Sequence, residues 1–346
     1  MKQLLGLLLG ALSFAVPAFS QWQPQSVGTD ASFRAVSVAG AGVVWIGGTK
    51  GTFVRTVDGG KTWQTGTVPD AQTCDFRDVQ AIDAQTAILM SAGPAEKGQA
   101  RIYKTTDGGQ HWTLLYQTQQ EGVFFDGMDF WDDQHGIVFS DPLTDASVGR
   151  RWFMLTTDDG GKTWQPVPPA SLPVMEPNEA AFAASGTSIT VQGKRNVWIA
   201  SGGGVVGRVF RSKDRGRTWT VSNTPLPAGE ATGLFGMHFF TEKIGVVVGG
   251  NYKQEQQPGP NGAITRDGGQ TWQLLAPTDP PGLKEAVALL PGDRLLTVGP
   301  SGTSLSADQG QTWQRLDTDG FHSVACAKGI CYAVGAKGKV AVQRFK

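Results

Sequence analysis

The sequence predicts an all-β fold, a seven-bladed β-propeller whose blades are four-stranded antiparallel sheets. Three observations predict it: one short motif recurs six times, its copies lie 41 to 55 residues apart, and short apolar strands fill every interval. A strand-built repeat of this length is typical of propellers and solenoids, in which each unit buries its faces against its neighbours. The 47 glycines suit the many tight turns that such a fold needs.

The repeated motif reads Ser/Thr-x-Asp-x-Gly-x-Thr-Trp, and only His111 departs from it, replacing Thr in the second copy. The pattern indicates a hairpin, because Asp accepts hydrogen bonds from the backbone ahead of it and Gly takes the positive φ of a tight turn. The motif resembles the Asp-box, or BNR, repeat of sialidases and related propellers. That resemblance implies a structural turn away from the binding face. The repeated aspartates and tryptophans are Asp58, Asp107, Asp159, Asp214, Asp267, Asp308, Trp63, Trp112, Trp164, Trp219, Trp272 and Trp313.

The first blade illustrates the order of strands within a unit. Residues 33–38, 43–46 and 52–55 are apolar runs, and the box then leads into a fourth strand over residues 62–66. The same order recurs around the other five boxes. The first six blades are therefore expected at approximately 32–68, 75–120, 124–168, 179–224, 233–277 and 284–317.

The seventh blade is expected to join the two ends of one domain that spans residues 21–346. Residues 320–346 supply three strands without a box, and residues 21–28 resemble the strand that follows each box. Pairing the N-terminal strand with the last three would cover an otherwise open sheet edge. A six-bladed ring with a separate C-terminal hairpin is the alternative.

Residues 1–20 are predicted to be a signal peptide rather than part of the fold. Lys2 precedes an apolar stretch from Leu4 to Ala18, and small residues stand before Gln21. The stretch is short for a membrane span, although an uncleaved anchor is an alternative. The expected mature protein is exported, periplasmic or secreted, with no transmembrane segment after signal cleavage.

Composition excludes several classes of partner and cofactor. Thirty basic residues balance thirty acidic ones, so nothing indicates nucleic acid as a partner. The four histidines lack zinc spacing, and the glycine-rich run 202–207 continues into a strand rather than the helix of a dinucleotide site. No metal and no cofactor are therefore expected. Cys326 and Cys331 flank a predicted turn and are a possible disulfide, which leaves Cys74 as a buried side chain.

The candidate binding residues come from aligning the innermost strands of the seven blades. One position at the start of each strand holds Arg34, Arg77, Asp126, Glu179, Phe235, Glu285 and His322. These side chains form either a solvated rim or a mixed-charge ring around the channel mouth, where two arginines would suit a carboxylate. Longer loops at 140–151, 168–179 and 250–260 predict a pocket over blades three to five, flanked by Asp126, Arg150, Arg151, Glu179, Tyr252 and Lys253.

Three functional interpretations remain open from the sequence. A sialidase-like glycosidase acting on a glycan is one, with Asp126, Glu179 and Glu285 as the alternative catalytic carboxylates. However, residues 284–289, where such enzymes would place a catalytic tyrosine, contain none. A purely structural module is another.

The interpretation that we favour is a non-catalytic binding propeller. Residues 124–136 and 245–250, together with the boxes, resemble the photosystem II stability/assembly factor-like family of exported propellers. This resemblance implies an assembly-factor-like protein that binds an envelope or secreted protein client on the face formed by the loops before the innermost strands and between the two middle strands. Acidic residues share the ring with Arg34 and Arg77, so the photosynthetic role of that family is not transferred.

Overall fold

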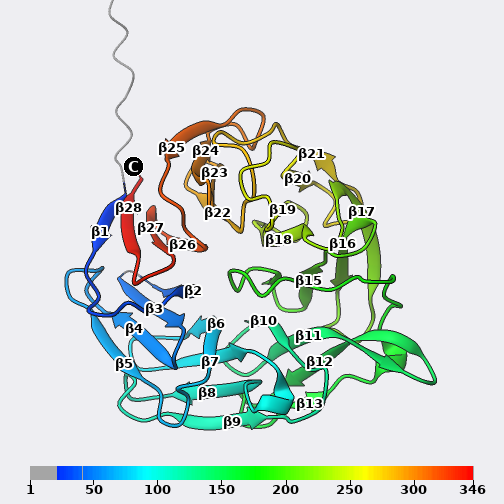
Figure 1. Cartoon of the computed structure of the whole chain (residues 1–346), viewed down its shortest axis with the longest axis horizontal. Helices are drawn as coiled ribbons and strands as arrows, with labels where there is room; N and C mark the ends of the chain where they lie inside the picture. The colour runs from blue at the N-terminus through cyan, green and yellow to red at the C-terminus, as the bar shows by residue number, and fades with distance from the viewer. Residues whose placement is uncertain (1–21, 41, 346) are drawn as a thin grey trace, which may run out of the picture.

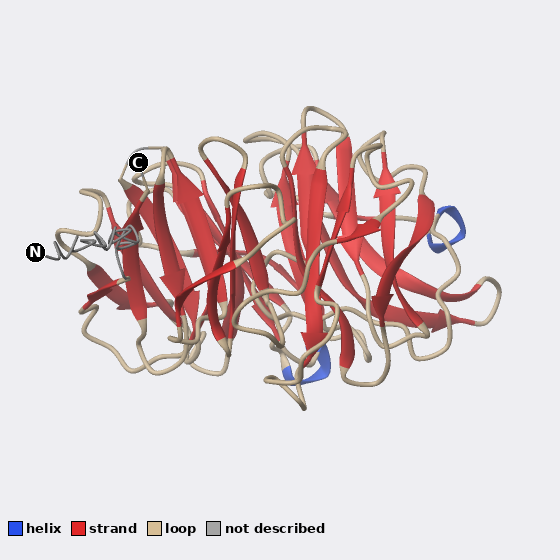
Figure 2. Cartoon of the chain, turned by 90° about the horizontal axis from the view of Figure 1, so that it is seen from above, coloured by secondary structure: helices blue, strands red, loops and turns tan. Residues whose placement is uncertain are grey.

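The computed structural model describes residues 22–40 and 42–345 and confirms the seven-bladed propeller. Seven four-stranded antiparallel sheets surround a central axis, and the innermost strand of each faces that axis (Figure 1). Seen from the edge, the molecule is a disc whose strands run through its thickness (Figure 2). The predicted signal peptide lies outside the described residues. None of the described helices is long and apolar enough to cross a membrane.

The blades follow one another along the chain, and each of the first six has its four strands in sequence order. The strands of blades one to three are β2 (Phe33–Ala39), β3 (Val43–Gly48), β4 (Thr52–Thr56), β5 (Gln64–Thr67), β6 (Asp75–Ala81), β7 (Ala87–Ala92), β8 (Arg101–Thr105), β9 (Thr113–Gln117), β10 (Phe125–Phe130), β11 (Gly136–Asp145), β12 (Gly149–Thr157) and β13 (Gln165–Pro166). Two short 3-10 helices, Ala95–Lys97 and Pro169–Ser171, lie in loops.

The remaining blades repeat the arrangement. Their strands are β14 (Ile189–Gln192), β15 (Asn196–Ala200), β16 (Val206–Ser212), β17 (Thr220–Pro227), β18 (Thr232–Phe239), β19 (Gly245–Asn251), β20 (Gly262–Thr265), β21 (Gln273–Leu274), β22 (Ala286–Leu290), β23 (Arg294–Gly299), β24 (Gly302–Ser306), β25 (Gln314–Asp317), β26 (Ser323–Ala327), β27 (Ile330–Val334) and β28 (Val340–Arg344). The sheet of blade four begins at Ile189, ten residues after the expected start at Glu179.

The ring closes as the sequence predicts, through a strand from the opposite end of the chain. β1 (Gln23–Gln25) pairs antiparallel with β28, and Gln23 lies opposite Val342. Trp22, just ahead of β1, is 5% exposed. Its indole Nε1–H donates to Thr303 Oγ1 at 2.9 Å, and its ring lies 5.3 Å from that of Phe321. The N-terminal strand therefore covers the edge of blade seven and ties it to blade six.

The six boxes share one hydrogen-bonding scheme. In the first, Asp58 Oδ1 accepts from the backbone N–H of Lys61 and Thr62, and Thr62 Oγ1 donates to Asp58 Oδ2 at 2.6 Å. In the second, His111 Nδ1 lies 2.6 Å from Asp107 Oδ2 and takes the place of the threonine hydroxyl. The backbone and side-chain hydrogen bonds from His111 lower the pKa of Asp107 to about 2. The one departure from the motif thus preserves the turn.

The box tryptophans fill the spaces between blades. Trp112 of blade two packs on Trp45 and Phe53 of blade one, with ring centroids 6.1 and 5.2 Å apart. Trp63 of blade one packs in the same way on Tyr332 of blade seven. Both rings are partly buried, and the apolar area that they remove from water stabilises the contacts between blades.

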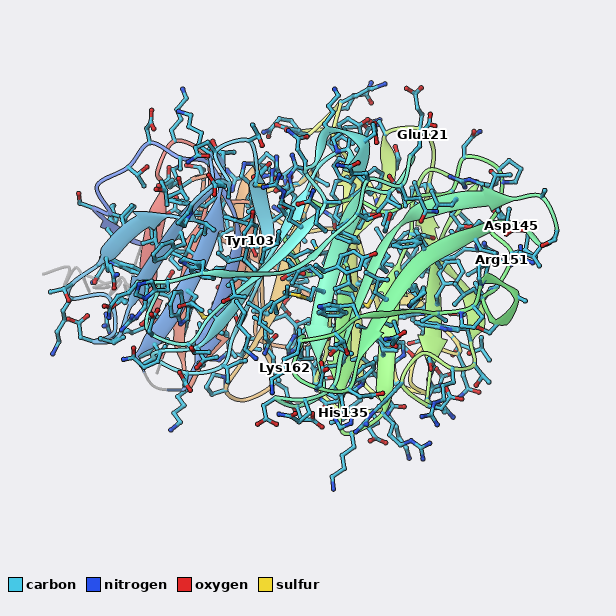
Figure 3. The ribbon with its side chains drawn as sticks, turned by 90° about the horizontal axis from the view of Figure 1, so that it is seen from below. Tyr103, Glu121, His135, Asp145, Arg151 and Lys162 are labelled. Atoms are coloured by element: carbon cyan, nitrogen blue, oxygen red, sulfur yellow. A yellow bond between two sulfur atoms is a disulfide. The ribbon has the colours of Figure 1, made fainter. Side chains whose placement is uncertain are left out.

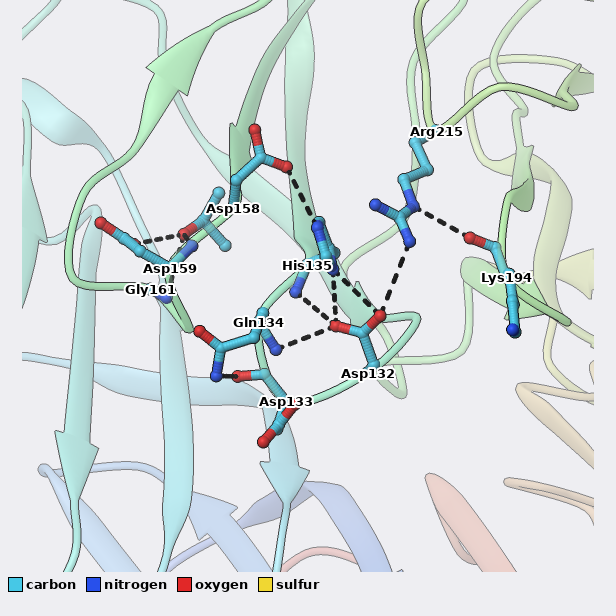
Figure 4. A network of polar contacts seen from close by, with 10 residues as sticks. Asp132, Asp133, Gln134, His135, Asp158, Asp159, Gly161, Lys194 and Arg215 are labelled. Atoms are coloured by element: carbon cyan, nitrogen blue, oxygen red, sulfur yellow. Dashed lines mark hydrogen bonds and ion pairs between the residues drawn. The ribbon is translucent and has the colours of Figure 1, made fainter.

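The turns between the first two strands of a blade hold the boxes on one face of the disc. Backbone N–H groups of the boxes donate to carbonyls of these turns, for example Gly108 N to Gln85 O at 2.8 Å and Gly160 N to Gln134 O at 2.8 Å. His135 in the same turn of blade three contacts Asp132 at 2.7 Å and lies 3.7 Å from Asp158, and Arg215 reaches Asp132 from blade four (Figure 4). This network links neighbouring blades on the box face, where His135 and Lys162 lie, opposite Glu121 (Figure 3).

One blade departs from the apolar pattern of the core. Phe33 and Phe321 occupy equivalent positions, because each donates its backbone N–H to a glycine of the preceding blade, Gly335 and Gly299 respectively. Lys284 makes the same contact with Gly249 and is fully buried. Its Nζ donates to Ser301 Oγ at 3.1 Å and to Gly302 O at 3.3 Å. Burial lowers the pKa of this lysine to about 7.

Candidate functional site

Four of the aligned positions at the channel mouth share one backbone feature. Arg34, Arg77, Asp126 and Phe235 each lie at the point where the pairing of the innermost strand shifts register. A β-bulge leaves one residue unpaired and re-aims its side chain. The alignment made from apolar pattern alone therefore identified the residues that the bulges direct toward the mouth.

The channel beneath these side chains is filled by a segment that the sequence did not reveal. Residues 181–188, which we call the channel plug, precede β14 and reach the middle of the ring just inward of β15 (Figure 1). The plug contacts blades on every side. Ala184 O accepts from Arg34 and Ala183 O from Arg77, while Ser185 Oγ donates to Glu285 O at 2.8 Å. Ser323 Oγ donates to Ser185 O at 2.8 Å.

A central cavity of about 360 Å³ opens between the plug and the surrounding loops. Six of the residues named from the sequence line it, and so do others that were not predicted. The lining comprises Arg34, Arg77, Phe124, Asp126, Asp141, Ala181, Phe182, Ala183, Ala184, Phe235, Tyr252, Glu255 and Glu285. These residues come from the beginnings of the innermost strands and the residues just before them, from the plug, from β11 and from the loop between β19 and β20.

The two arginines of the cavity already have partners within the protein. Arg77 Nε lies 2.7 Å from Asp75 Oδ2, and Arg77 Nη1 donates to Ala183 O at 3.1 Å. Arg34 Nη1 donates to Ala184 O at 3.0 Å and lies 3.6 Å from Glu285 Oε1. The two arginine side chains are nevertheless 27% and 30% exposed. They hold a main-chain segment and still face the cavity.

Glu285 joins the arginine to the last predicted residue of the ring. His322 Nδ1 lies 2.6 Å from Glu285 Oε2, on the opposite side of the carboxylate from Arg34. Glu285 is 5% exposed at its side chain. His322 therefore contributes to the mouth through Glu285 and does not itself line the cavity.

Asp126 is the least satisfied polar group of the cavity. It is 1% exposed, and its Oδ2 has no hydrogen-bond partner among the described residues. Burial, together with the neighbouring carboxyl of Asp141, raises the pKa of Asp126 well above its usual range. Burial also raises the pKa of Asp141. Burial beside this cavity thus raises the pKa of two adjacent carboxyl groups by disfavouring their ionised forms.

Glu179 lies away from the position that the sequence alignment gave it. The carboxylate accepts from Ser201 Oγ at 2.6 Å and from Arg208 Nε at 2.8 Å, and it is 1% exposed. Because residues 179–188 approach and form the plug, strand β14 starts only at Ile189. Glu179 therefore anchors the base of the plug through a buried ion pair and does not line the central cavity.

Of the predicted loop residues, only Tyr252 reaches the central cavity. Arg150 Nη1 donates to the carbonyls of Glu176 and Glu179 and so supports the segment before the plug. Arg151 lies on the long β11–β12 hairpin, which projects from the rim of the disc (Figure 3). Lys253 is exposed and pairs with Glu230 at 2.7 Å.

The plug also supplies an aromatic wall that the sequence reasoning missed. Phe182 stacks on Phe235 with ring centroids 4.2 Å apart and planes 9° apart. Tyr252 meets Phe182 edge-on at 5.8 Å. The one sequence signal was the small-residue run around Phe182, which lacks the β-branched residues of the other innermost strands. Such a run has a low propensity to form a strand, and its small side chains allow an irregular segment to pack closely.

The residues available for catalysis or metal binding are limited. The pair Asp126 and Glu179, considered for glycoside hydrolysis, is not assembled, because Glu179 is buried against Arg208. Asp126 and Glu285 share the cavity, but Glu285 is held between His322 and Arg34. Within residues 22–40 and 42–345 no three His, Cys, Asp or Glu side chains are grouped as a metal ion requires.

The predicted cysteine pair is bonded in the structure. Cys326 and Cys331 lie opposite each other across the β26–β27 hairpin and form a disulfide. Cys74 is buried as a free thiol. The disulfide lies near the outer end of its hairpin and contributes nothing to the cavity lining.

A second cleft, of about 320 Å³, lies on the box face between blades three and four. Trp131, His135, Asp158 and Arg215 are among its lining residues. Its charged groups contact one another in the network described above (Figure 4). Because the central cavity contains a buried carboxyl with an unpartnered oxygen, it is the stronger candidate for a binding site.

Comparison with known proteins supports the motif-based resemblance. The family model described as photosynthesis system II assembly factor YCF48 matches residues 14–120, and the BNR/Asp-box repeat model matches residues 155–166 and 263–274. No curated protein sequence matches the chain.

Solved structures share the fold at low sequence identity. YCF48 bound to D1 peptide is 20% identical, with a TM-score of 0.68 over 96% of this chain and 100% of that one. YCF48 from Cyanidioschyzon merolae is 15% identical, with a TM-score of 0.69 over 94% of this chain and 99% of that one. Virginiamycin B lyase from Staphylococcus aureus is 12% identical, with a TM-score of 0.65 and 94% and 99% coverage. Binding proteins and an enzyme thus share this architecture, and the fold alone does not decide function. The chain is a BNR/Asp-box repeat β-propeller, and over residues 14–120 it resembles the YCF48 family of photosynthesis system II assembly factors.

Proposed function

We propose that this chain is an exported, non-catalytic binding propeller that holds a segment of a protein client at its channel mouth. The observation that carries the proposal is the way in which Arg34 and Arg77 hold the plug. Both donate to main-chain carbonyls of an irregular segment, Ala184 and Ala183, while their side chains stay partly exposed to the cavity. The arginines at the channel mouth already donate to main-chain carbonyls of the plug. The same N–H groups can donate to the main chain of a bound peptide.

The similarity to YCF48 supports the same function. One YCF48 structure is described as bound to D1 peptide. The role in photosystem assembly is not part of the proposal, because acidic residues line the cavity of this chain alongside the arginines. An envelope or secreted protein is the expected class of client, and the apolar stretch before Gln21 supports export. The alternative glycosidase function is disfavoured because Glu179 is buried against Arg208 and does not line the cavity that Asp126 lines.

Site-specific crosslinking in the native cell tests the proposal. A photoreactive phenylalanine analogue at Tyr252 would report on the cavity, and the same analogue at Leu114, which is exposed on an outer strand, is the control. We expect one protein to be crosslinked from position 252, not from position 114, and to be lost in the variant Arg34→Ala/Arg77→Ala. The variant Arg215→Ala/Arg217→Ala on the box face should retain it.

Two outcomes would contradict the proposal. Equal crosslinking from positions 252 and 114 would mean that the cavity does not select a client. Hydrolysis of a glycoside by the wild-type protein, lost in Asp126→Asn, would instead establish the enzyme. Fractionation of the same cells tests export, since a protein retained in the cytoplasm with residues 1–20 uncleaved would overturn that part.

A further inference from the structure

The charges of the central cavity do not balance. Two arginines line it, together with four acidic residues. The acidic residues are Asp126, Asp141, Glu255 and Glu285. Arg34 faces Glu285, which also contacts His322, and Arg77 pairs with Asp75 outside the lining. Asp126, Asp141 and Glu255 are therefore left facing the cavity without a paired arginine, although the charges of Arg77 and Arg150 lie near Asp126 and Asp141 respectively.

Asp126 marks where a ligand group would fit. Its Oδ2 is buried and has no partner among the described residues, although Asp126 lines the cavity. A buried acceptor without a donor costs about 1–3 kcal/mol, so such a group calls for an explanation. The nearby Asp141 carboxyl accepts only a long hydrogen bond, 3.4 Å, from Ala181 N. Among the described residues Asp126 Oδ2 thus lacks a donor, and Asp141 beside it has a weakly bonded oxygen, so a ligand N–H group could donate to both carboxyls.

Aromatic rings form the other side of the same space. Phe182 and Phe235 stack on each other, and Tyr252, which is 44% exposed, stands edge-on to Phe182. An ammonium or guanidinium ion is attracted to aromatic faces, and the alkyl chain that carries it packs on them. Acidic groups beside aromatic walls are the arrangement expected for an alkylammonium group.

We propose that the central cavity binds a cationic amino group of the client, with Asp126 and Asp141 as its acceptors and Phe182, Phe235 and Tyr252 as its walls. The inference rests on the proposed function in assigning the amino group to a protein client. The preference of the cavity for a cationic amino group follows from these residues alone. The group is a lysine side chain or a free chain terminus, and the experiment below separates the two.

Binding of such a cation is coupled to proton release. The pKa of Asp126 and of Asp141 is raised, chiefly by burial. A bound cation favours the ionised carboxylates and so lowers both pKa values. Affinity for the cation therefore rises as the pH rises, until both carboxyl groups are ionised in the free protein. Arg34, Arg77, Arg150, Glu255, Glu285 and His322 are the other charged or titratable groups that surround this space.

The test uses the full mature chain and tripeptides blocked at both ends. The central residue is lysine, norleucine or glutamate between two alanines, and a fourth peptide has norleucine with a free N-terminal amine. Binding is measured by calorimetry at several pH values and in two buffers of different ionisation enthalpy. We expect the lysine or the free-amine peptide to bind at least about tenfold more tightly than blocked norleucine. The tighter of the two identifies the source of the amino group.

Substitutions of cavity residues test whether they cause the preference for amine-bearing peptides. Asp126→Asn is expected to abolish the tenfold preference and the proton release, and its thermal unfolding checks that the ring is intact. Glu255→Gln, at an exposed lining residue, should reduce the preference without any risk to folding. Asp158→Asn is the matched control, because Asp158 is an exposed carboxylate on the box face.

The proposal is overturned if blocked norleucine binds as tightly as both amines, if Asp126→Asn keeps the preference, or if neither amine binds at millimolar concentration. These failures differ from failure of the proposed function. A client crosslinked at position 252 without any amine preference would refute only the cationic ligand. An amine preference without a client in the cell would refute only the binding of a protein.

Discussion

Closure of the ring by Trp22 gives the sharpest test of the architecture. Trp22→Ala removes a side chain that is 5% exposed and packs on Phe321. A buried Trp removes roughly 150–250 Å² from water, or about 4–6 kcal/mol at 25 cal/mol per Å². The variant also leaves Thr303 Oγ1 without the indole donor, which costs about 1 kcal/mol. Part of the loss is recovered by relaxation, so we expect a destabilisation of about 3–5 kcal/mol.

Urea unfolding followed by tryptophan fluorescence and circular dichroism measures this loss. With an m-value of about 3 kcal/mol per M, the midpoint should fall by about 1–1.7 M. Trp22→Phe keeps the ring but not the N–H donor and should recover most of the stability. Val205→Ala, at a side chain that is 86% exposed, is the control and should change stability by less than about 0.5 kcal/mol. A loss below about 1 kcal/mol for Trp22→Ala at unchanged m would refute the closure of the ring by this end of the chain.

Four further outcomes concern His111, Lys284, the disulfide and Asp129, which lies on β10 and accepts from the backbone N–H of Val191 at 2.7 Å. His111→Thr should leave stability unchanged and His111→Ala should lower it, because either His or Thr can hydrogen-bond to the Asp107 carboxylate. Equal melting temperatures for the two variants would contradict this. Burial raises the pKa of Asp129 to about 7, against about 3.9 in the unfolded chain. Between about pH 4 and 7 the folded state therefore keeps a proton that the unfolded state loses, so stability should fall as the pH rises. Asp129→Asn should reduce this fall, measured as the urea midpoint at each pH. Lys284 gives a pH dependence of stability with the opposite sign. Its folded pKa of about 7 lies below the unfolded value of about 10.4, so stability should rise from about pH 7 to 10. Lys284→Met should abolish that rise. Reduction of the Cys326–Cys331 disulfide, which spans five residues, should cost no more than about 2 kcal/mol, less than Trp22→Ala; complete unfolding on adding reductant would contradict this.

The fold could be predicted because its signals are local and repeated. Each box fixes a turn through contacts within a few residues, as between Asp58 and Thr62, and the same reasoning applies six times. Closure followed from the likeness of the segment around Trp22 to the strands after the boxes. Arg34, Arg77 and Asp126 followed from the apolar pattern because a bulge displaces one residue at the same place in each strand.

The plug could not be predicted because nothing local specifies it. Residues 181–188 are held by groups from distant blades, such as Arg34 and Ser323, and not by their own propensity. Alignment on apolar pattern therefore assigned Glu179 to a strand that begins only at Ile189. The cavity wall of Phe182 depends on that same path. Long-range contacts of irregular segments leave little periodicity in the sequence.

Closure by β1 also sets the order in which the chain can fold. Gln23 pairs with Val342, so the first strand to leave the ribosome waits for nearly the last one. At about 5–20 residues per second, the wait is roughly 15–65 s. During synthesis blades one to six can stack, but the ring stays open and its two outer faces stay unpaired.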